Sequence, residues 1–294
     1  MRIAIIGSNG QLGSDVVREF SENSDEVDVL THADLEVEDF QSVRTALLRL
    51  DPQVVVNTAA LHDVEVCERE PEKAFNANAL GPRNVALVAR ELEAVFMHVS
   101  TDYVFDGNSS TPYEEADLPR PLNCYGNTKL AGEYFVRCTS EKHFVLRTSG
   151  LFGKSPCRGK RSPNFVELML KLARERGEVR VVNDEMVSPT STTELARQIV
   201  ALSRSQRYGL YHATAEGSCS WYEFAREIFE LTGTRVALKV ASANEFPAKV
   251  PRPRYSVLEN RALKLAGLNT FLPWQDGLRD YLGVGRQCAT EARL

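Results

Sequence analysis

The sequence has little of what marks a metal-binding, secreted or membrane-spanning protein. Its six cysteines are widely spaced and form no Cys-x-x-Cys pair, which argues against a zinc site or a disulfide framework. The five histidines also lack the spacing of metal ligands, so we expect no structural metal. The apolar run at residues 3–6 stops at Gly7 and is too short for a signal peptide or a spanning helix.

The chain also lacks charge blocks, internal repeats and low-complexity linkers. Its net charge of −5 comes from acids and bases that are interspersed along the sequence. That balance argues against a dedicated binder of nucleic acid or of anionic membranes. We therefore expect a soluble, cytoplasmic protein with neither partner. The chain of 294 residues, 43% of them hydrophobic, is long enough to bury a large core as one domain or as two unequal lobes.

A glycine fingerprint follows the first apolar run. Residues 2–6 predict a strand buried on both faces, and residues 7–13 read Gly-x-x-Gly-x-x-Gly ahead of an amphipathic helical stripe. In such a turn Gly7 allows the sharp bend, Gly10 lets the backbone approach a pyrophosphate, and Gly13 lets the helix pack closely. The pattern predicts a dinucleotide site.

The segment after the second predicted strand bears on the choice of cofactor. Residues 27–30 predict that strand, and dinucleotide folds place after it an acid for a ribose hydroxyl or a base for a 2′-phosphate. Residues 31–36 offer acids but no Lys or Arg, which mildly favours NADH. His32 and Arg18 could still meet a phosphate, so the sequence leaves NADH and NADPH both open.

Helical and strand patterns then alternate. A helical stripe over residues 40–50, a buried strand at 54–56, a helix over 79–92 and a buried strand at 95–99 follow in turn. This alternation predicts an α/β fold with a Rossmann-like, doubly wound parallel sheet.

The C-terminal half predicts a smaller α/β substrate lobe. A helix follows Asn164, a second is expected to be capped by Thr192 or Thr193, and a third by Ser220. Short strands are expected between them at 179–182 and 210–212.

The resulting domain prediction has three parts. They are a mainly dinucleotide-binding domain at 1–150, a mainly substrate-binding lobe at 151–284 with some exchange of chain between the two, and a frayed tail at 285–294.

Tyr125 and Lys129 form a pair with catalytic potential. Their spacing on a predicted helix puts both side chains on one face, with Cβ atoms roughly 6 Å apart. An ammonium at ~5 Å would lower the pKa of a phenol by roughly 2 units, so Tyr125 could donate a proton near neutral pH. A solvated lysine beside a half-buried ring is the alternative. Thr101 follows the strand at 95–99, at the sheet edge where open α/β folds bind ligands.

Several segments carry a joint similarity. They are Gly-x-x-Gly-Gln-Leu-Gly at 7–13, Asn-Thr-Ala-Ala at 57–60, Thr-Asp-Tyr-Val-Phe-Asp-Gly at 101–107 and Tyr-Gly-x-x-Lys-Leu-x-Gly-Glu at 125–133. Together they resemble the dTDP-4-dehydrorhamnose reductase family of extended short-chain dehydrogenase/reductases. The similarity continues to about residue 282, at 147–149, 164–165, 187–190, 220–225 and 252–253.

The resemblance implies a reductase that uses NADH or NADPH on a nucleotide-linked 4-keto-6-deoxy sugar, from dTDP-4-dehydrorhamnose to dTDP-L-rhamnose. It implies Thr101, Tyr125 and Lys129 as catalytic residues, with Tyr125 as proton donor. The expected substrate contacts are Thr101, Asp102, Tyr103, Asn164 and Arg252. The implied cofactor contacts are Gly7, Asn9, Gly10, Gln11, Leu12, Glu36, Val37, Ala59, Ala60, Asn78, Tyr125 and Lys129.

Two departures from the family pattern lie on the substrate side. Leu61-His62 stand where the family has an aromatic-Thr pair, and Gly150 stands where it has a tryptophan that faces the nucleotide-sugar. These departures leave the nucleotide and the sugar open. The sequence also leaves a homodimer possible.

Two alternatives to a reductase remain. One is a nucleotide-sugar epimerase or 4,6-dehydratase on the same fold, although dehydratases carry Asp-Glu after the threonine and Tyr103 takes the second position here. The other is a regulatory subunit that keeps the dinucleotide-binding fold without catalysis. The intact set of Thr101, Tyr125 and Lys129 favours an enzyme.

Overall fold

A six-stranded parallel sheet organises the computed structural model, which describes residues 1–156, 163–241 and 250–284. In spatial order its strands are β10 (Gly209–His212), β5 (His143–Thr148), β4 (Val95–Thr101), β3 (Val54–Asn57), β1 (Arg2–Ile6) and β2 (Glu26–Leu30). Each neighbouring pair runs parallel. The strand order reverses between β1 and β3, where open α/β sheets bind ligands. The predicted Rossmann-like sheet is confirmed.

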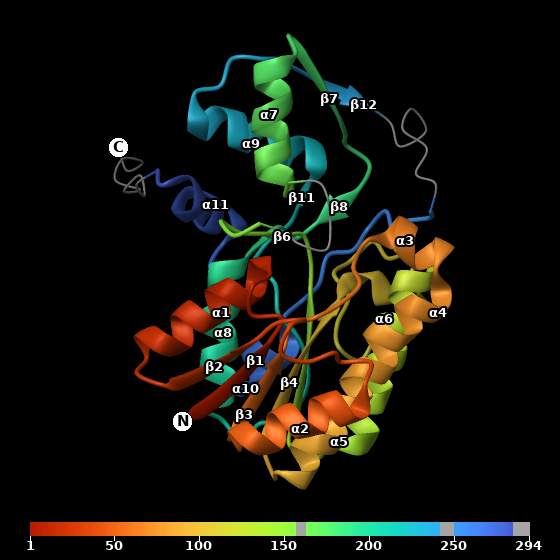
Figure 1. The fold of residues 1–294 in the computed structure, drawn as a ribbon. Helices are drawn as coiled ribbons and strands as arrows, with labels where there is room; N and C mark the ends of the chain where they lie inside the picture. Colours follow the sequence, from red (N-terminus) through yellow and green to blue (C-terminus); the bar gives the residue numbers. More distant parts are fainter. Residues whose placement is uncertain (157–162, 242–249, 285–294) are drawn as a thin grey trace.

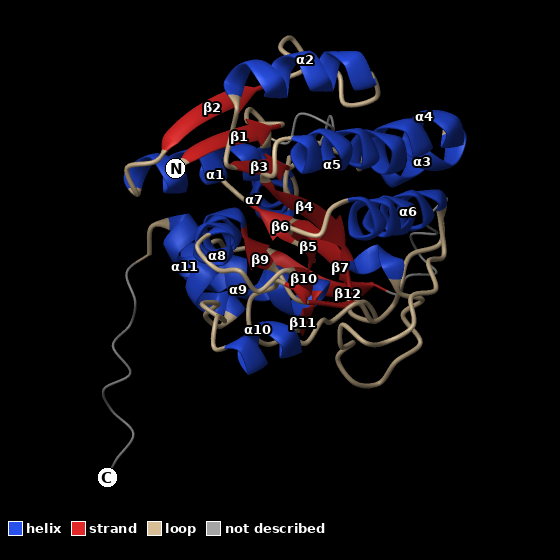
Figure 2. Ribbon diagram, turned by 90° about the horizontal axis from the view of Figure 1, so that it is seen from below, coloured by secondary structure: helices blue, strands red, loops and turns tan. Residues whose placement is uncertain are grey.

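Helices cover both faces of this sheet (Figure 2). On one face lie α1 (Gln11–Glu22) and α8 (Thr192–Ser203), and on the other lie α2 (Phe40–Leu50), α5 (Gly81–Glu91) and α6 (Cys124–Thr139). Because successive side chains of a strand point to opposite faces, Ile5 packs with α1 while Ile6 packs with α2 and α5. Burial on both faces explains the uninterrupted apolar run in β1.

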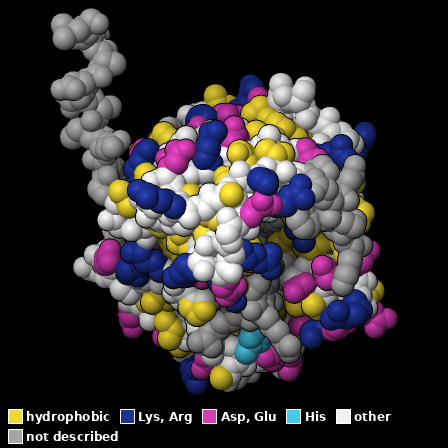
Figure 3. Space-filling view, turned by 90° about the horizontal axis from the view of Figure 1, so that it is seen from above, with side chains coloured by type: hydrophobic (Ala, Val, Ile, Leu, Met, Phe, Trp, Pro, Cys, Tyr) yellow, Lys and Arg dark blue, Asp and Glu magenta, His cyan; other side chains and the backbone are white. Residues whose placement is uncertain are grey.

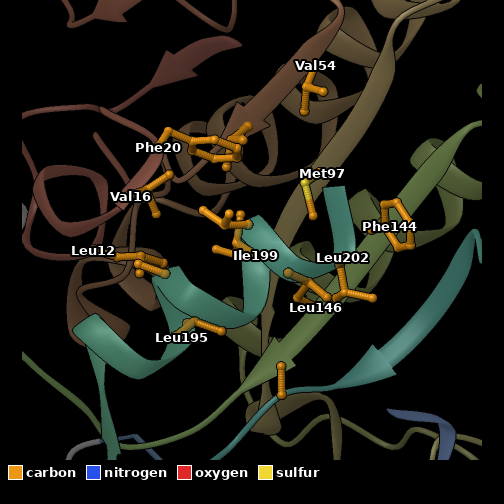
Figure 4. Packing of buried hydrophobic residues seen from close by; sticks show 14 of the residues in the cluster. Leu12, Val16, Phe20, Val54, Met97, Phe144, Leu146, Leu195, Ile199 and Leu202 are labelled. Carbon is orange, nitrogen blue, oxygen red and sulfur yellow. The ribbon is translucent and has the colours of Figure 1, made fainter. Parts of the chain in front are cut away.

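The core between the sheet and α1 depends on residues spaced four apart. Leu12, Val16 and Phe20 of α1 interlock with Leu195 and Ile199 of α8 (Figure 4). This spacing places each set on one side of its helix, so that the two helices share one apolar layer over the strands.

Two elements that the sequence placed in the smaller lobe belong to the main sheet instead. The strand expected at 210–212 is β10, which pairs with β5, and the helix near residue 192 is α8, which packs on α1. The expected cap at Thr192 or Thr193 is also wrong, because Ser191 precedes α8 and makes no side-chain cap. The cap at Ser220 is confirmed: its hydroxyl accepts a hydrogen bond from Glu223 N.

A smaller lobe stands over the carboxyl edge of the sheet (Figure 1). It contains α7 (Phe165–Glu175), α9 (Trp221–Thr232), α11 (Trp274–Leu282) and the parallel pair β7 (Glu178–Val182) and β12 (Ala237–Ala241). Phe152, Met169, Phe224 and Trp274 lie in its core. Acidic and basic side chains are interspersed over the face of this lobe (Figure 3).

Short elements complete the described chain. They are α3 (Val64–Arg69), α4 (Pro71–Phe75), the π-helical turn η1 (Asn76–Leu80), the 3-10 turn η2 (Asp102–Val104), α10 (Arg261–Ala266), and the pairs β6 (Leu151–Phe152) with β9 (Thr190–Ser191) and β8 (Met186–Val187) with β11 (Cys219–Ser220). The tail predicted at 285–294 lies outside the described residues. No helix of the described chain is long and apolar enough to cross a membrane.

A buried ion pair joins α6 to the sheet. Arg147 of β5 donates to Glu133 of α6 through Nε at 2.9 Å and Nη2 at 2.7 Å, and both side chains are 2% exposed or less. Ser100 of β4 donates to the same carboxylate, and the guanidinium lies 5.1 Å above the ring of Phe105. Removing one charge would leave the other buried without its partner.

We predict that Glu133→Gln lowers the free energy of unfolding by about 3–5 kcal/mol, because it leaves the Arg147 guanidinium buried beside a neutral amide. Glu91→Gln is the matched control, since Glu91 forms a similar two-point pair with Arg44 on the surface. Urea unfolding of both variants measures the difference. Equal losses of stability would contradict the role of the buried pair.

Candidate active site

The turn between β1 and α1 forms a cradle for an anion. Gly7 has φ of +78°, and a Cβ at this position would lie 2.9 Å from Ala59 N. A Cβ at Gly13 would lie 2.1 Å from Gly7 O, so only glycine permits this packing of turn and helix. Gly10 is the N-cap of α1 and provides no side-chain cap for the first-turn amides. These amides and the helix dipole fit the diphosphate of a dinucleotide.

Two other predicted cofactor residues in this turn are partly committed to the fold. Leu12 of α1 is buried in the core between this helix, α8 and the sheet, and Gln11 Nε2 donates to Gly153 O at 3.3 Å. Asn9 lies in the turn itself, between Gly7 and the start of α1. Contacts of all three with a cofactor stay predictions.

The predicted adenine side lies beyond the end of β2. Val37 is buried in the core, whereas Glu36 is exposed and its carboxylate lies 2.9 Å from His32 Nδ1. Arg18, which the sequence offered as a phosphate partner, pairs with Asp15 at 2.7 Å and also hydrogen-bonds α8. The structure therefore commits Arg18 to the contact between α1 and α8.

The loop after β3 lines the other side of the switch point. Thr58 Oγ1 donates to Ile6 O at 2.9 Å, and Ala59 N donates to Asn57 Oδ1 at 3.0 Å. These bonds hold the loop against the ends of β1 and β3. The small side chains of Ala59 and Ala60 leave space for a flat group to approach the backbone.

Asn78 braces this loop from η1. Its side chain is fully buried; Oδ1 accepts from Leu61 N and Nδ2 donates to Leu61 O, both at 2.9 Å. Nδ2 also donates to Thr128 of α6 at 3.1 Å. Asn78 thus positions the loop, and its direct contact with a cofactor stays a prediction.

Thr101 and Tyr125 come together at the carboxyl end of β4. Thr101 ends that strand, and Tyr125 lies in the first turn of α6, whose N-cap Asn123 accepts from Gly126 N at 2.9 Å. Tyr125 lies close enough to Thr101 for the threonine hydroxyl to act on the phenol, and Thr101 Oγ1 donates to Asp102 Oδ1 at 3.0 Å. The Tyr125 hydroxyl can donate to a carbonyl oxygen here, and the Thr101 hydroxyl can do so when it turns from Asp102.

Lys129 lies one helical turn beyond Tyr125 and reaches into the sheet. Its side chain is 2% exposed, and its Nζ donates to Val99 O at 2.6 Å. The same Nζ lies 3.3 Å from His98 Nε2. Burial lowers the pKa of Lys129 to about 8.

The pKa of Tyr125 differs from the one that helical spacing predicted. Burial raises the pKa of Tyr125 well above its usual range; the nearby Thr101 hydroxyl opposes this rise, and the Asp102 carboxyl adds to it. The prediction that Lys129 lowers the pKa of Tyr125 is wrong for this structure. Lys129 donates to Val99 O instead, and burial is the largest effect on the Tyr125 pKa. Tyr125 therefore keeps its proton at neutral pH, which is the form that can donate.

Three predicted substrate residues surround the hydroxyl pair. Asp102 is buried and accepts from Ser149 Oγ at 2.8 Å, and burial raises the pKa of its carboxyl. The ring of Tyr103 lies 5.7 Å from that of Tyr125, edge to face. Arg252 lies close enough for its charge to act on the Tyr103 hydroxyl.

Asn164, the other predicted substrate residue, connects elements of the smaller lobe. Its Oδ1 accepts from Glu167 N at 3.1 Å as the N-cap of α7, and its Nδ2 donates to Gly153 O at 3.0 Å and to Tyr281 Oη at 3.2 Å. These bonds give Asn164 a structural role, and its contact with a substrate stays a prediction.

The departure at Gly150 has a structural reason. Gly150 has φ of +56°, and a Cβ there would lie 3.0 Å from Val187 Cγ2 and 3.1 Å from Pro189 Cα. The tryptophan expected from the resemblance would therefore require the chain to move. The other departure, Leu61-His62, lies in the loop that Asn78 braces.

Sequence reasoning gave no role to a set of buried polar residues beneath the site, namely Asn57, His98, Ser100, Glu133 and Arg147. A signal was available for one of them. His98 stands between Met97 and Val99 in a segment that otherwise predicts a strand buried on both faces, and a buried polar residue needs a partner.

Comparisons with known proteins agree with this geometry. The family model described as RmlD substrate binding domain matches residues 1–286. The spore coat polysaccharide biosynthesis protein SpsK of Bacillus subtilis is 39% identical over 281 residues, which cover 96% of each chain.

Two solved structures are also similar. A dTDP-4-dehydrorhamnose reductase from Clostridium acetobutylicum has a TM-score of 0.92 and 38% identity, and the match covers 97% of this chain and 99% of that one. A dTDP-4-dehydrorhamnose reductase from Bacillus anthracis, solved in complex with NADP, has a TM-score of 0.90 and 36% identity, with 96% and 98% covered.

We predict that Gly150→Ala lowers the free energy of unfolding by about 1–3 kcal/mol, because a Cβ is strained at positive φ and crowds Val187. Gly177→Ala is the control, since it has no positive φ and no atom within 4 Å of the added Cβ. Urea unfolding should show Gly177→Ala to be neutral or slightly stabilising. A harmless Gly150→Ala would contradict the explanation of this departure.

Proposed function

This chain belongs to the family of the RmlD substrate-binding domain, and from that premise we propose that it reduces the 4-keto group of a nucleotide-linked 6-deoxyhexose with NADH or NADPH. The names of the similar structures support dTDP-4-dehydrorhamnose as substrate, and its reduction at C4 would give dTDP-L-rhamnose. The observation that carries the proposal is the placement of Tyr125 beside Thr101 at the end of β4, with the buried Lys129 one helical turn away.

Reduction of a ketone requires a proton at its oxygen as the carbon accepts a hydride. When bound, the reduced nicotinamide supplies that hydride. Tyr125, which burial keeps protonated, donates its proton to the developing alkoxide. The Thr101 hydroxyl turns from Asp102 to donate to the same oxygen. Lys129, one helical turn away on the same helix face, helps to restore the proton of Tyr125.

The surrounding residues suit a nucleotide-sugar. Arg252 offers a guanidinium that can bind a diphosphate at two points, and it lies beside Tyr103. Tyr103 in turn offers an aromatic edge next to Tyr125, where a sugar ring would lie. Asp102 is held by Thr101 and Ser149, so its carboxyl is fixed for hydrogen bonding.

The two alternatives are less well supported. Tyr103 packs against Tyr125 at the position where dehydratases carry a second carboxylate for proton transfer at the sugar carbons. A regulatory subunit would not require Thr101 beside Tyr125 and a buried lysine of lowered pKa.

We predict that Tyr125→Phe cuts the turnover number for reduction by about 10²–10⁴, because the variant lacks the proton donor, while cofactor affinity stays nearly unchanged. Tyr134→Phe is the matched control: this tyrosine lies on the same helix but is 54% exposed. Steady-state assays and cofactor titration measure both effects. Near-normal turnover in Tyr125→Phe would refute the assignment of Tyr125 as the proton donor.

The substrate is tested with a panel of dTDP-, UDP- and GDP-linked 4-keto-6-deoxy sugars, assayed by loss of reduced-cofactor absorbance. We expect turnover with the dTDP-linked sugar. Turnover only with another nucleotide would refute the substrate but keep the reductase. No turnover with any member would favour the regulatory subunit.

A further inference from the structure

His98 lies beneath the site, between Lys129 and Asn57. It is fully buried in β4, directly opposite Asn57 of β3. Its Nε2 lies 3.3 Å from Lys129 Nζ, and its Nδ1 lies 3.4 Å from Asn57 Nδ2. Burial, with the charge of Lys129, keeps the pKa of His98 well below its usual range, so the ring is neutral. A neutral imidazole has one N–H donor and one acceptor nitrogen.

The orientation of the Asn57 amide selects between the two tautomers of the ring. Asn57 Oδ1 accepts a hydrogen bond from Ala59 N at 3.0 Å, and a reversed amide would set two donors against each other there. Asn57 Nδ2 therefore faces His98, and His98 Nδ1 is the acceptor. The ring proton is then on Nε2 and points at Lys129.

This tautomer fits a neutral amine at Lys129 and conflicts with an ammonium. An amine accepts from His98 Nε2 and still donates to Val99 O, whereas an ammonium has no acceptor. When Lys129 is charged, the ring proton must move to Nδ1, where it faces the donor of Asn57. The pair of Asn57 and His98 therefore favours the amine, while the ring can hydrogen-bond either form.

We propose that His98, oriented by Asn57, is a positioning residue that lets Lys129 release and regain a proton in each turnover without losing its hydrogen bond. The proposal rests on the reductase function proposed above, in which Tyr125 becomes a phenolate. One proton leaves the Lys129 ammonium as the Tyr125 phenolate regains one. Solvent then restores the ammonium.

The other titratable groups that face Lys129 do not offer this exchange. They are Glu133 and Cys67, with Tyr125 on the same helix face. Glu133 is already paired with Arg147 at 2.7 Å. Burial raises the pKa of Cys67 to about 12, so that thiol stays neutral over the working range. Of these side chains and His98, only His98 lies within hydrogen-bonding distance of Lys129 Nζ in the described chain, and its ring can accept from the ammonium or donate to the amine.

A pH profile of Asn57→Asp tests the proposal. In the unchanged protein, the turnover number for reduction should fall as pH rises through about 8, where Lys129 loses its proton. In Asn57→Asp, the carboxylate accepts from His98 Nδ1, so His98 Nε2 can accept from the Lys129 ammonium. Because this stabilises the ammonium, the pH at which turnover falls should rise by about one unit or more.

The same substitution in a His98→Phe background separates the hydrogen bond from the added charge. If Asn57→Asp acts through the imidazole ring, it should shift the pH of the fall in turnover at least about twice as far with His98 present as in the His98→Phe background. Equal shifts in both backgrounds would show that the carboxylate acts through space alone and would overturn the proposal.

Nitrogen NMR of the histidine rings gives a second test that needs neither turnover nor a substituted Asn57. Among the five histidines, His98 is assigned by its loss in His98→Phe. Its ring should stay neutral over the whole pH range. The ring proton should be on Nδ1 at pH values below the fall in turnover, where Lys129 is charged, and on Nε2 at pH values above it. A ring that becomes cationic, or one that keeps the same tautomer throughout, would refute the proposal even if the reductase function holds.

Discussion

The structure depends on burying the polar face of one helix against the sheet. Tyr125, Lys129 and Glu133 follow one another at four-residue spacing along α6 and therefore share one face. The strands meet that face with polar partners: Val99 O accepts from Lys129, and Arg147 pairs with Glu133. Because an unpaired buried charge is costly, these partners set the rotation and the height of α6 on the sheet.

The active site follows from that placement. Once α6 is fixed, its first turn brings Tyr125 to the end of β4, where Thr101 meets it. The N-cap residue Asn123 donates to Pro251 O at 2.9 Å, which holds the loop that carries Arg252 beside the same edge. The parallel strands put the cradle between β1 and α1 at this edge as well, so the cradle, the two hydroxyls and the loop that carries Arg252 converge.

Local sequence patterns predicted the features that depend on neighbouring residues. The glycine fingerprint, the stripe that forms α2 and the cap at Ser220 are each set by contacts within one turn or one helix. The direction of Lys129 was missed because helical spacing says which face a side chain occupies and not where it ends. Its partner Val99 lies 30 residues away, and the sheet partner of β10 is more distant still.

The central claim is that a hydride passes from the cofactor to the ketone carbon of the sugar. The most direct test is to supply the nucleotide-linked 4-keto-6-deoxy sugar with reduced cofactor deuterated at C4 of the nicotinamide, and to locate the label by NMR. The account predicts one deuterium at C4 of the sugar for each cofactor oxidised. A changed sugar without deuterium and without net cofactor oxidation would contradict it and would indicate an internal return of hydride, as in an epimerase or dehydratase.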